Sequence, residues 1–114
     1  MAQAFMQLEQ VGNGFRMTGG GRSDSVMFLD EYSIGGSTTA DVDTTVSFAD
    51  YTAVIAGFSG YGVDAREMYM IKDTSSGTWH IHGASGSAFG SNAFAKVLFI
   101  SRFLCTDNGE TTQA

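Results

Sequence analysis

The stretch Phe94–Cys105, with the sequence FAKVLFISRFLC, has hydrophobic side chains at both odd and even positions. Successive side chains of a β-strand point to opposite faces of its sheet, so both faces of this segment are largely apolar. A helix is the competing interpretation, but Phe, Val and Ile predominate and no capping pattern precedes the segment. The pattern therefore predicts a long central strand that is covered on both faces, by a second sheet or by another copy of the chain.

The two faces of this predicted strand differ in charge. The even-numbered positions include Lys96 and Arg102, and charged side chains suit a rim or a subunit contact better than a core. The apolar members of the even face, which we predict to form a subunit interface, are Leu98, Ile100 and Leu104. The odd-numbered positions that we predict to fill the core include Val97, Phe99 and Phe103.

Short hydrophobic or alternating segments recur along the rest of the chain. The sequence has 15 glycines and no proline, so Gly, Asn, Asp and Ser must form its turns. The other segments with strand character are Ala4–Gln10, Phe15–Thr18, Ser25–Ser33, Val42–Phe48, Tyr51–Phe58, Met68–Lys72 and Thr78–Gly83. About seven or eight short strands separated by turn signals indicate an all-β protein, an antiparallel and jelly-roll-like β-sandwich.

Three local patterns add detail to this sandwich. Asn13-Gly14 is a pair favoured in two-residue turns and predicts an N-terminal hairpin. Val42–Phe48 alternates as a strand with one exposed face does, whereas Tyr51–Phe58 is apolar on both faces and is predicted to be interior. Val63–Tyr69 has helix-favouring residues and a candidate N-cap in Asp64, so a short helix is the alternative for this segment.

Length, charge and cysteine content limit the classes of partner. The 114 residues fit one domain, with residues 1–8 and 106–114 as candidate contact arms. Six basic and twelve acidic residues give a net charge of −6, and the basic residues are scattered singly. We therefore expect no binding to nucleic acid or to a membrane surface. The single Cys105 excludes an internal disulfide, and with no signal peptide in view we expect synthesis in a reducing cytoplasm.

His80 and His82 are the strongest candidates for a metal site. Two histidines at this spacing on a strand project from the same face, but zinc needs further ligands and the sequence suggests no third residue. The alternative is a pair of polar residues on an exposed strand face. In a trimer, His rings from three copies could also meet near the axis and respond to pH. Asp41 and Asp43 likewise share one face, and the solvated-face interpretation is preferred for them.

The sequence contains no motif that predicts catalysis. The glycine–serine stretches Gly57–Tyr61 and Gly83–Ser87 each lack the second glycine of a nucleophile elbow. We therefore expect no enzymatic activity and no cofactor. Aromatic residues in or beside loops could instead stack on sugars or anchor a protein contact, or they could cap the ends of the sandwich. The candidates for such ligand or partner binding are Trp79, Tyr61 and Phe89.

The order of several segments resembles a known class of proteins. These segments are Val46-x-Phe48, Tyr51–Phe58, Trp79-His80-Ile81 and Val97–Arg102 (VLFISR). Over about residues 42–104 the pattern is similar to the small β-sandwich virion proteins of tailed bacteriophages, which include head decoration (cement) proteins and tail-fibre tip modules. The resemblance implies a homotrimer without enzymatic activity, made in the host cytoplasm and located in the virion.

Two functional hypotheses follow from the resemblance and the aromatic residues. The first is a homotrimeric capsid decoration protein that binds the major capsid protein or other virion proteins and stabilises the head. The second is a tail-fibre or lectin-like module that recognises a host surface glycan through Trp79, Tyr61 and the loop containing Phe89. A metal-binding β protein that uses His80 and His82 is a third alternative.

Overall fold

The computed structural model describes residues 6–19, 25–59, 65–85 and 92–104, and within these ranges it contains eight strands and no helix. The strands are β1 (Met6–Val11), β2 (Gly14–Gly19), β3 (Met27–Ser33), β4 (Thr39–Ser47), β5 (Tyr51–Ser59), β6 (Ala65–Asp73), β7 (Thr78–Ser85) and β8 (Phe94–Ser101). The described ranges thus hold no helix that is long and apolar enough to cross a membrane. Each of the eight predicted strands is present, which confirms the all-β class.

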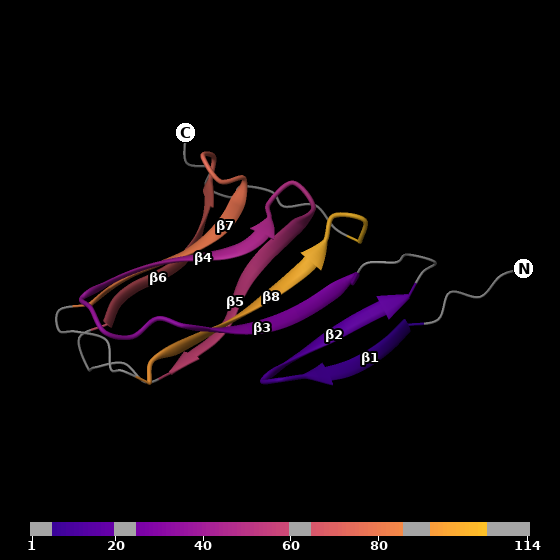
Figure 1. Cartoon of the computed structure of the whole chain (residues 1–114), viewed down its shortest axis with the longest axis horizontal. Coiled ribbons are helices and arrows are strands. Elements are labelled where there is room, and N and C mark those ends of the chain that lie inside the picture. Colours follow the sequence, from indigo (N-terminus) through magenta and orange to yellow (C-terminus); the bar gives the residue numbers. More distant parts are fainter. Residues whose placement is uncertain (1–5, 20–24, 60–64, 86–91, 105–114) are drawn as a thin grey trace, which may run out of the picture.

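Two antiparallel sheets pack together as a β-sandwich (Figure 1). The larger sheet has the strand order β1-β2-β3-β8-β5 and the smaller one β4-β7-β6. Successive strands alternate between the sheets from β3 to β6, so most connections cross the sandwich. β8 lies between β3 and β5, which confirms its prediction as a central strand. Figure 1 also shows β1 and β2 extending beyond the area covered by the smaller sheet.

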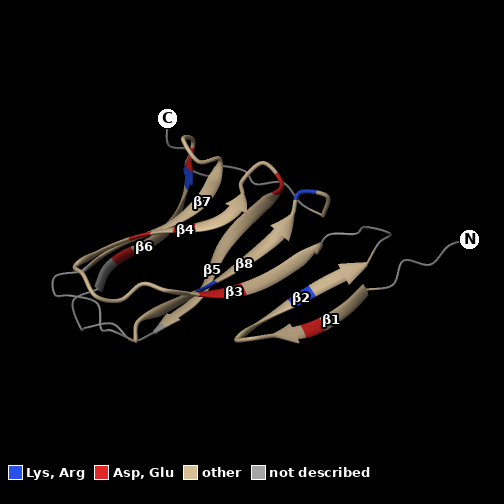
Figure 2. Ribbon diagram, viewed as in Figure 1, with Lys and Arg blue, Asp and Glu red and all other residues tan. Residues whose placement is uncertain are grey.

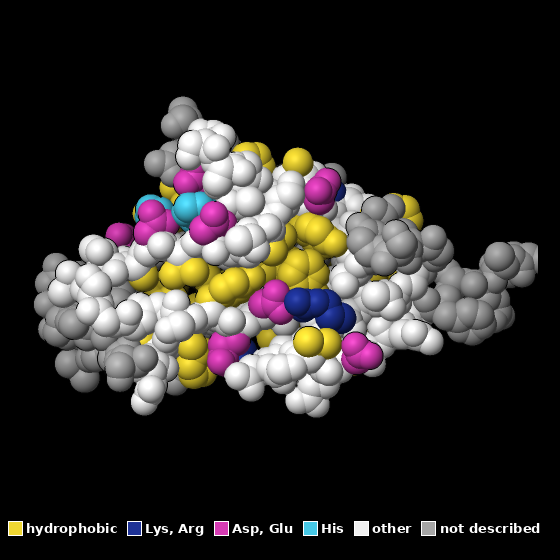
Figure 3. Space-filling model, viewed as in Figure 1, with side chains coloured by type: hydrophobic (Ala, Val, Ile, Leu, Met, Phe, Trp, Pro, Cys, Tyr) yellow, Lys and Arg dark blue, Asp and Glu magenta, His cyan; other side chains and the backbone are white. Residues whose placement is uncertain are grey.

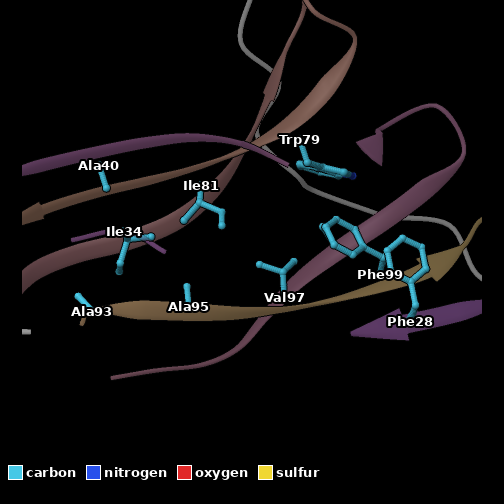
Figure 4. Close-up of a cluster of buried hydrophobic side chains, with 10 residues drawn as sticks. Phe28, Ile34, Ala40, Trp79, Ile81, Ala93, Ala95, Val97 and Phe99 are labelled. Carbon is cyan, nitrogen blue, oxygen red and sulfur yellow. The ribbon is translucent and has the colours of Figure 1, made fainter. Parts of the chain in front are cut away.

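The core lies between β8 and the smaller sheet (Figure 4). Ala95, Val97 and Phe99 point from β8 into this layer and have no exposed surface. From the opposite sheet, Trp79 and Ile81 of β7 close the core with exposures of 1% and 0%. The alternation of buried and partly exposed residues along β8 therefore places the predicted core face, Val97 and Phe99, against the second sheet.

Buried polar groups in this core have hydrogen-bond partners. The Trp79 Nε1–H donates to the carbonyl of Tyr51 at 2.8 Å, which links β7 to β5 across the sandwich. The Thr44 hydroxyl donates to the carbonyl of Trp79 at 2.7 Å, although Thr44 is only 3% exposed. An unpaired buried polar group would cost about 1–3 kcal/mol, so these bonds stabilise one relative placement of the strands.

The N-terminal hairpin forms as predicted, but its turn lies one residue earlier. Val11 pairs with Gly14, and the two loop residues are Gly12 and Asn13, with a positive φ of 55° at Gly12. Glycine at the first loop position suits this turn. Gly14 instead belongs to β2, where an added Cβ would overlap the backbone carbonyl of Leu29. Its lack of a side chain allows β2 to approach β3.

The structure corrects two predictions about the interior and the alternative helix. Tyr51–Phe58 is not interior, because β5 is an edge strand in which Val54 is 51% and Phe58 49% exposed. The alternative helix is wrong over the described residues of its range, since Ala65–Asp73 pairs with β7 as a strand. The ladder with β7 runs without interruption from Glu67 to Asp73, and its hydrogen bonds outweigh a weak helix propensity.

The last strand is also shorter than Phe94–Cys105. β8 ends at Ser101, and a turn follows in which the Leu104 amide donates to the Ser101 carbonyl at 2.8 Å. Phe103 therefore lies outside the core and is 60% exposed, which corrects its predicted burial. Arg102 anchors this turn, because its Nη2 donates to the carbonyl of Phe48 at 2.7 Å.

Candidate functional site

The face of the five-stranded sheet that points away from the core is apolar over most of its width. Residues directly opposite each other in an antiparallel ladder project to the same face, so the register identifies this surface. One row crosses β1, β2, β3 and β8 as Leu8, Met17, Met27 and Ile100. The adjacent row crosses β2, β3, β8 and β5 as Phe15, Leu29, Leu98 and Val54. These eight side chains are called the outer apolar face below.

The outer apolar face is accessible in the folded chain. Leu8 is 65% and Val54 51% exposed, and the six side chains between them are partly exposed. Charged residues are scattered over the strands of this sheet (Figure 2). Contiguous apolar patches on soluble proteins mark binding surfaces more often than isolated exposed residues do. Leu98 and Ile100 were predicted as interface residues, and the structure places both on this surface; Leu104 is 42% exposed in the turn after β8.

The contribution of β1, β2 and β3 to this surface was not recognised in the sequence. One signal was available, because Ser25–Ser33 has apolar residues on both faces, as Phe94–Cys105 has. Met27 and Leu29 lie on one face of this segment, and Val26 and Phe28 lie on the other. The structure pairs the two segments in register, Leu29 with Leu98, so their second apolar faces merge. Strand order, which the sequence does not show, joins them.

The second notable group is a histidine–aspartate cluster on the outer face of the smaller sheet (Figure 3). Its central residue is His80 of β7, whose side chain is 12% exposed. The Nδ1 atom lies 2.8 Å from Oδ1 of Asp41, and the Nε2 atom lies 3.2 Å from Oδ2 of Asp73 and 3.7 Å from Oδ2 of Asp43. Nε2 of His82 lies 3.4 Å from the same Asp41 oxygen. The hydroxyl oxygen of Ser76 also lies 3.3 Å from Nε2 of His80.

Hydrogen bonds keep two of these carboxylates ionised. The Thr78 hydroxyl at 2.7 Å, followed by the Thr45 amide at 2.8 Å, holds the pKa of Asp43 below its ordinary value. The side chain and then the backbone amide of Ser75 act in the same direction on the pKa of Asp73. The cluster thus joins β4, β7 and β6 through charge and hydrogen bonds.

The cluster has no arrangement that supports metal binding. Among the described residues, no group of three or more His, Cys, Asp or Glu side chains could hold a metal ion. Both nitrogens of His80 face carboxylates of neighbouring strands, and the ring of His82 lies 5.6 Å from that of Tyr69.

We expect Asp43 to make stability depend on pH in the acid range. Its pKa is lowered in the folded state, so its contribution is present above the ordinary aspartate value of about 3.9 and is lost as the pH falls below it. In D43N, thermal unfolding followed between pH 6 and pH 3 should show a smaller loss of stability than in the wild type. T78V removes the main hydrogen-bond donor to Asp43 and should likewise make stability depend less steeply on pH. Identical pH slopes in all three proteins would contradict this role of Asp43.

The predicted ligand-binding aromatics are not assembled into one site by the described residues. Trp79 was a candidate for ligand or partner binding, with capping of the sandwich as the alternative, but it is 1% exposed and its indole N–H donates to the carbonyl of Tyr51. It belongs to the core because β7 is the central strand of the smaller sheet and faces β8. Tyr61 and Phe89, like residues 1–5 and 106–114 of the candidate arms, lie outside the described residues.

Comparison of the chain with protein-family models, curated proteins and solved structures gives no match. The functional argument therefore depends on the two surfaces described above. One is apolar and continuous over five strands, and the other is charged and internally hydrogen-bonded.

Proposed function

We propose that this chain is a non-enzymatic structural protein that assembles with copies of itself through the outer apolar face, as a homotrimeric decoration protein of a tailed-phage capsid would. The observation that carries the proposal is the pair of apolar rows across the sheet on the side opposite the core. A solvated sheet face would show polar residues at these positions. The low share of charged residues, 16%, is also compatible with a protein packed in an assembly.

The magnitude of the apolar surface is adequate for a stable contact. Complete burial of one Leu, Met, Ile or Phe side chain contributes about 1.5–3 kcal/mol, and these eight residues start partly exposed. Association costs about 4–15 kcal/mol in lost translational and rotational freedom. Burial of most of the outer apolar face would offset that cost. Attached to a head, such trimers would bridge neighbouring subunits of the major capsid protein and resist internal pressure.

Charge introduced into the outer apolar face is expected to dissociate the assembly without unfolding the subunit. Val54→Glu places a carboxylate in the second apolar row at a side chain that is 51% exposed. Light scattering after size exclusion should give a mass of at least three chains for the wild type and of at most two chains for V54E, with unchanged circular dichroism. The matched control is Thr39→Glu, an exposed position on the outer face of the other sheet, which should remain assembled.

Two results would remove the proposal. One is a wild-type protein that is monomeric at all concentrations and does not bind capsids. The other is a V54E variant with the same mass as the wild type. Leu98→Ala, a milder change in the same row, should weaken assembly while the folded state persists.

A further inference from the structure

The edge strands of the two described sheets differ in regularity. The four edges are β1, β5, β4 and β6. Register shifts interrupt β5 between Ile55 and Gly57, β4 between Asp43 and Ser47, and β6 between Ala65 and Glu67. β1 alone among these four pairs with its neighbour without interruption over all six residues. Bulges are a common device against edge-to-edge pairing, so three edges are protected in this way and β1 is not.

β1 also lacks the other features that prevent pairing. Its sequence, MQLEQV, contains no lysine and no proline, and its one charge is Glu9. All six residues are exposed, and within the described part of the chain no strand lies on its outer side. A regular, exposed edge with apolar residues is a template for another strand.

The hairpin geometry shows which backbone groups are available. In a two-residue hairpin the residues flanking the loop, here Val11 and Gly14, form a hydrogen-bonded pair. Hydrogen-bonded and non-hydrogen-bonded positions alternate along an antiparallel strand. The N–H and C=O groups of Met6, Leu8 and Gln10 therefore point away from β2, toward the free edge.

We propose that β1 is a second self-association site, at which the β1 strands of two copies pair antiparallel about a twofold axis with Leu8 opposite Leu8. An axis perpendicular to the sheet keeps the same face outward in both copies. Two opposed residues must therefore both have even numbers or both have odd numbers. The register centred on Leu8 pairs five residues of each described strand and places Gln7 opposite Glu9. The register centred on Glu9 also pairs five, but it sets two carboxylates opposite each other at a non-hydrogen-bonded position, where Cα atoms are about 4.5 Å apart.

This pairing is separate from the contact of the proposed function. It uses the backbone edge of β1, whereas the trimer contact uses side chains on the sheet face. The paired sheet would contain ten strands, and the two outer apolar faces would be continuous across the twofold axis. Leu8, the most exposed of the large hydrophobic residues described, would lie at its centre with 65% of its surface available for burial.

Cysteine cross-linking tests the pairing and its register. In a Cys105→Ser background, which removes the only native cysteine, Leu8→Cys, Glu9→Cys and Gln10→Cys are oxidised under mild conditions. Opposed residues at a hydrogen-bonded position have Cα atoms about 5.5 Å apart, within the range of about 4.4–6.8 Å for a disulfide. Two copies of residue 10 would be four residues apart, about 13 Å along the strands.

We expect L8C to form a covalent dimer on a denaturing, non-reducing gel, and Q10C to remain largely monomeric. Addition of Val54→Glu to L8C should leave the cross-link unchanged, which separates this site from the sheet-face contact. Equal yields for L8C and Q10C would indicate random collision and overturn the pairing. A higher yield for E9C than for L8C would overturn the proposed register.

Discussion

Replacement of Phe99 by alanine is expected to lower the free energy of unfolding by about 3–5 kcal/mol, the usual cost of removing a buried aromatic ring. Phe99 has no exposed surface. Its ring stacks on Phe28 with centroids 4.8 Å apart and meets Tyr32 edge-to-face at 6.5 Å. A small domain has about 5–15 kcal/mol of stability in total, so this loss is a large fraction of it and F99A should unfold at a clearly lower urea concentration. Urea denaturation followed by fluorescence measures the loss.

The neighbouring residue provides a matched control. Leu98 lies next to Phe99 on β8 but points to the outer apolar face and is partly exposed. L98A should therefore cost clearly less stability than F99A in the dissociated subunit, and its main effect should be on the mass measured by light scattering. Equal losses of stability in the two variants would contradict the assignment of core and outer faces on β8.

Trp79→Ala is expected to be equally severe, at about 3–5 kcal/mol. The indole is 1% exposed, packs edge-to-face on Phe48 with centroids 6.3 Å apart, and donates its N–H to the Tyr51 carbonyl at 2.8 Å. The change removes the largest buried side chain. It also leaves the Tyr51 carbonyl without the indole N–H that donates to it. Equilibrium unfolding in urea should show the loss.

Trp79→Phe separates packing from hydrogen bonding. It retains most of the ring but leaves the Tyr51 carbonyl without the indole donor, which should cost about 1–3 kcal/mol. Stability should therefore fall in the order wild type, W79F, W79A. A W79A protein that keeps wild-type stability but loses binding on a glycan array would show that Trp79 acts at the surface, contrary to its position in the core.

The strands could be predicted because their signals are local. Alternation along Val42–Phe48 and apolar residues on both faces of Phe94–Ser101 each depend on neighbouring residues, and glycines mark the turns. The core face of β8 could be predicted because Lys96 lies on the even-numbered face. A charged side chain makes that face less suitable for burial. The sandwich class follows from the number of such strands.

Strand order could not be predicted, and the main errors result from this. Tyr51–Phe58 has the composition of an interior strand but is at an edge, since no strand of the described sheet follows β5. Trp79 follows a turn and was therefore a candidate for ligand or partner binding, whereas the central position of β7 buries it. The histidine–aspartate cluster likewise requires the pairing of Asp43 with His80, which joins distant parts of the chain. Each of these depends on long-range register.

The central position of β8 has a consequence for synthesis of the chain on the ribosome. β3 and β5 do not pair with each other, because β8, the last strand of the described sheets, lies between them and is the one partner of β5 within these sheets. The meander β1–β2–β3 can form early from local contacts, but the larger sheet cannot close until Ser101 has left the exit tunnel. Until then the edges of β3 and β5 that pair with β8 remain open, a state in which chains aggregate or bind chaperones. Pairing over such sequence separations also makes the final closure slow.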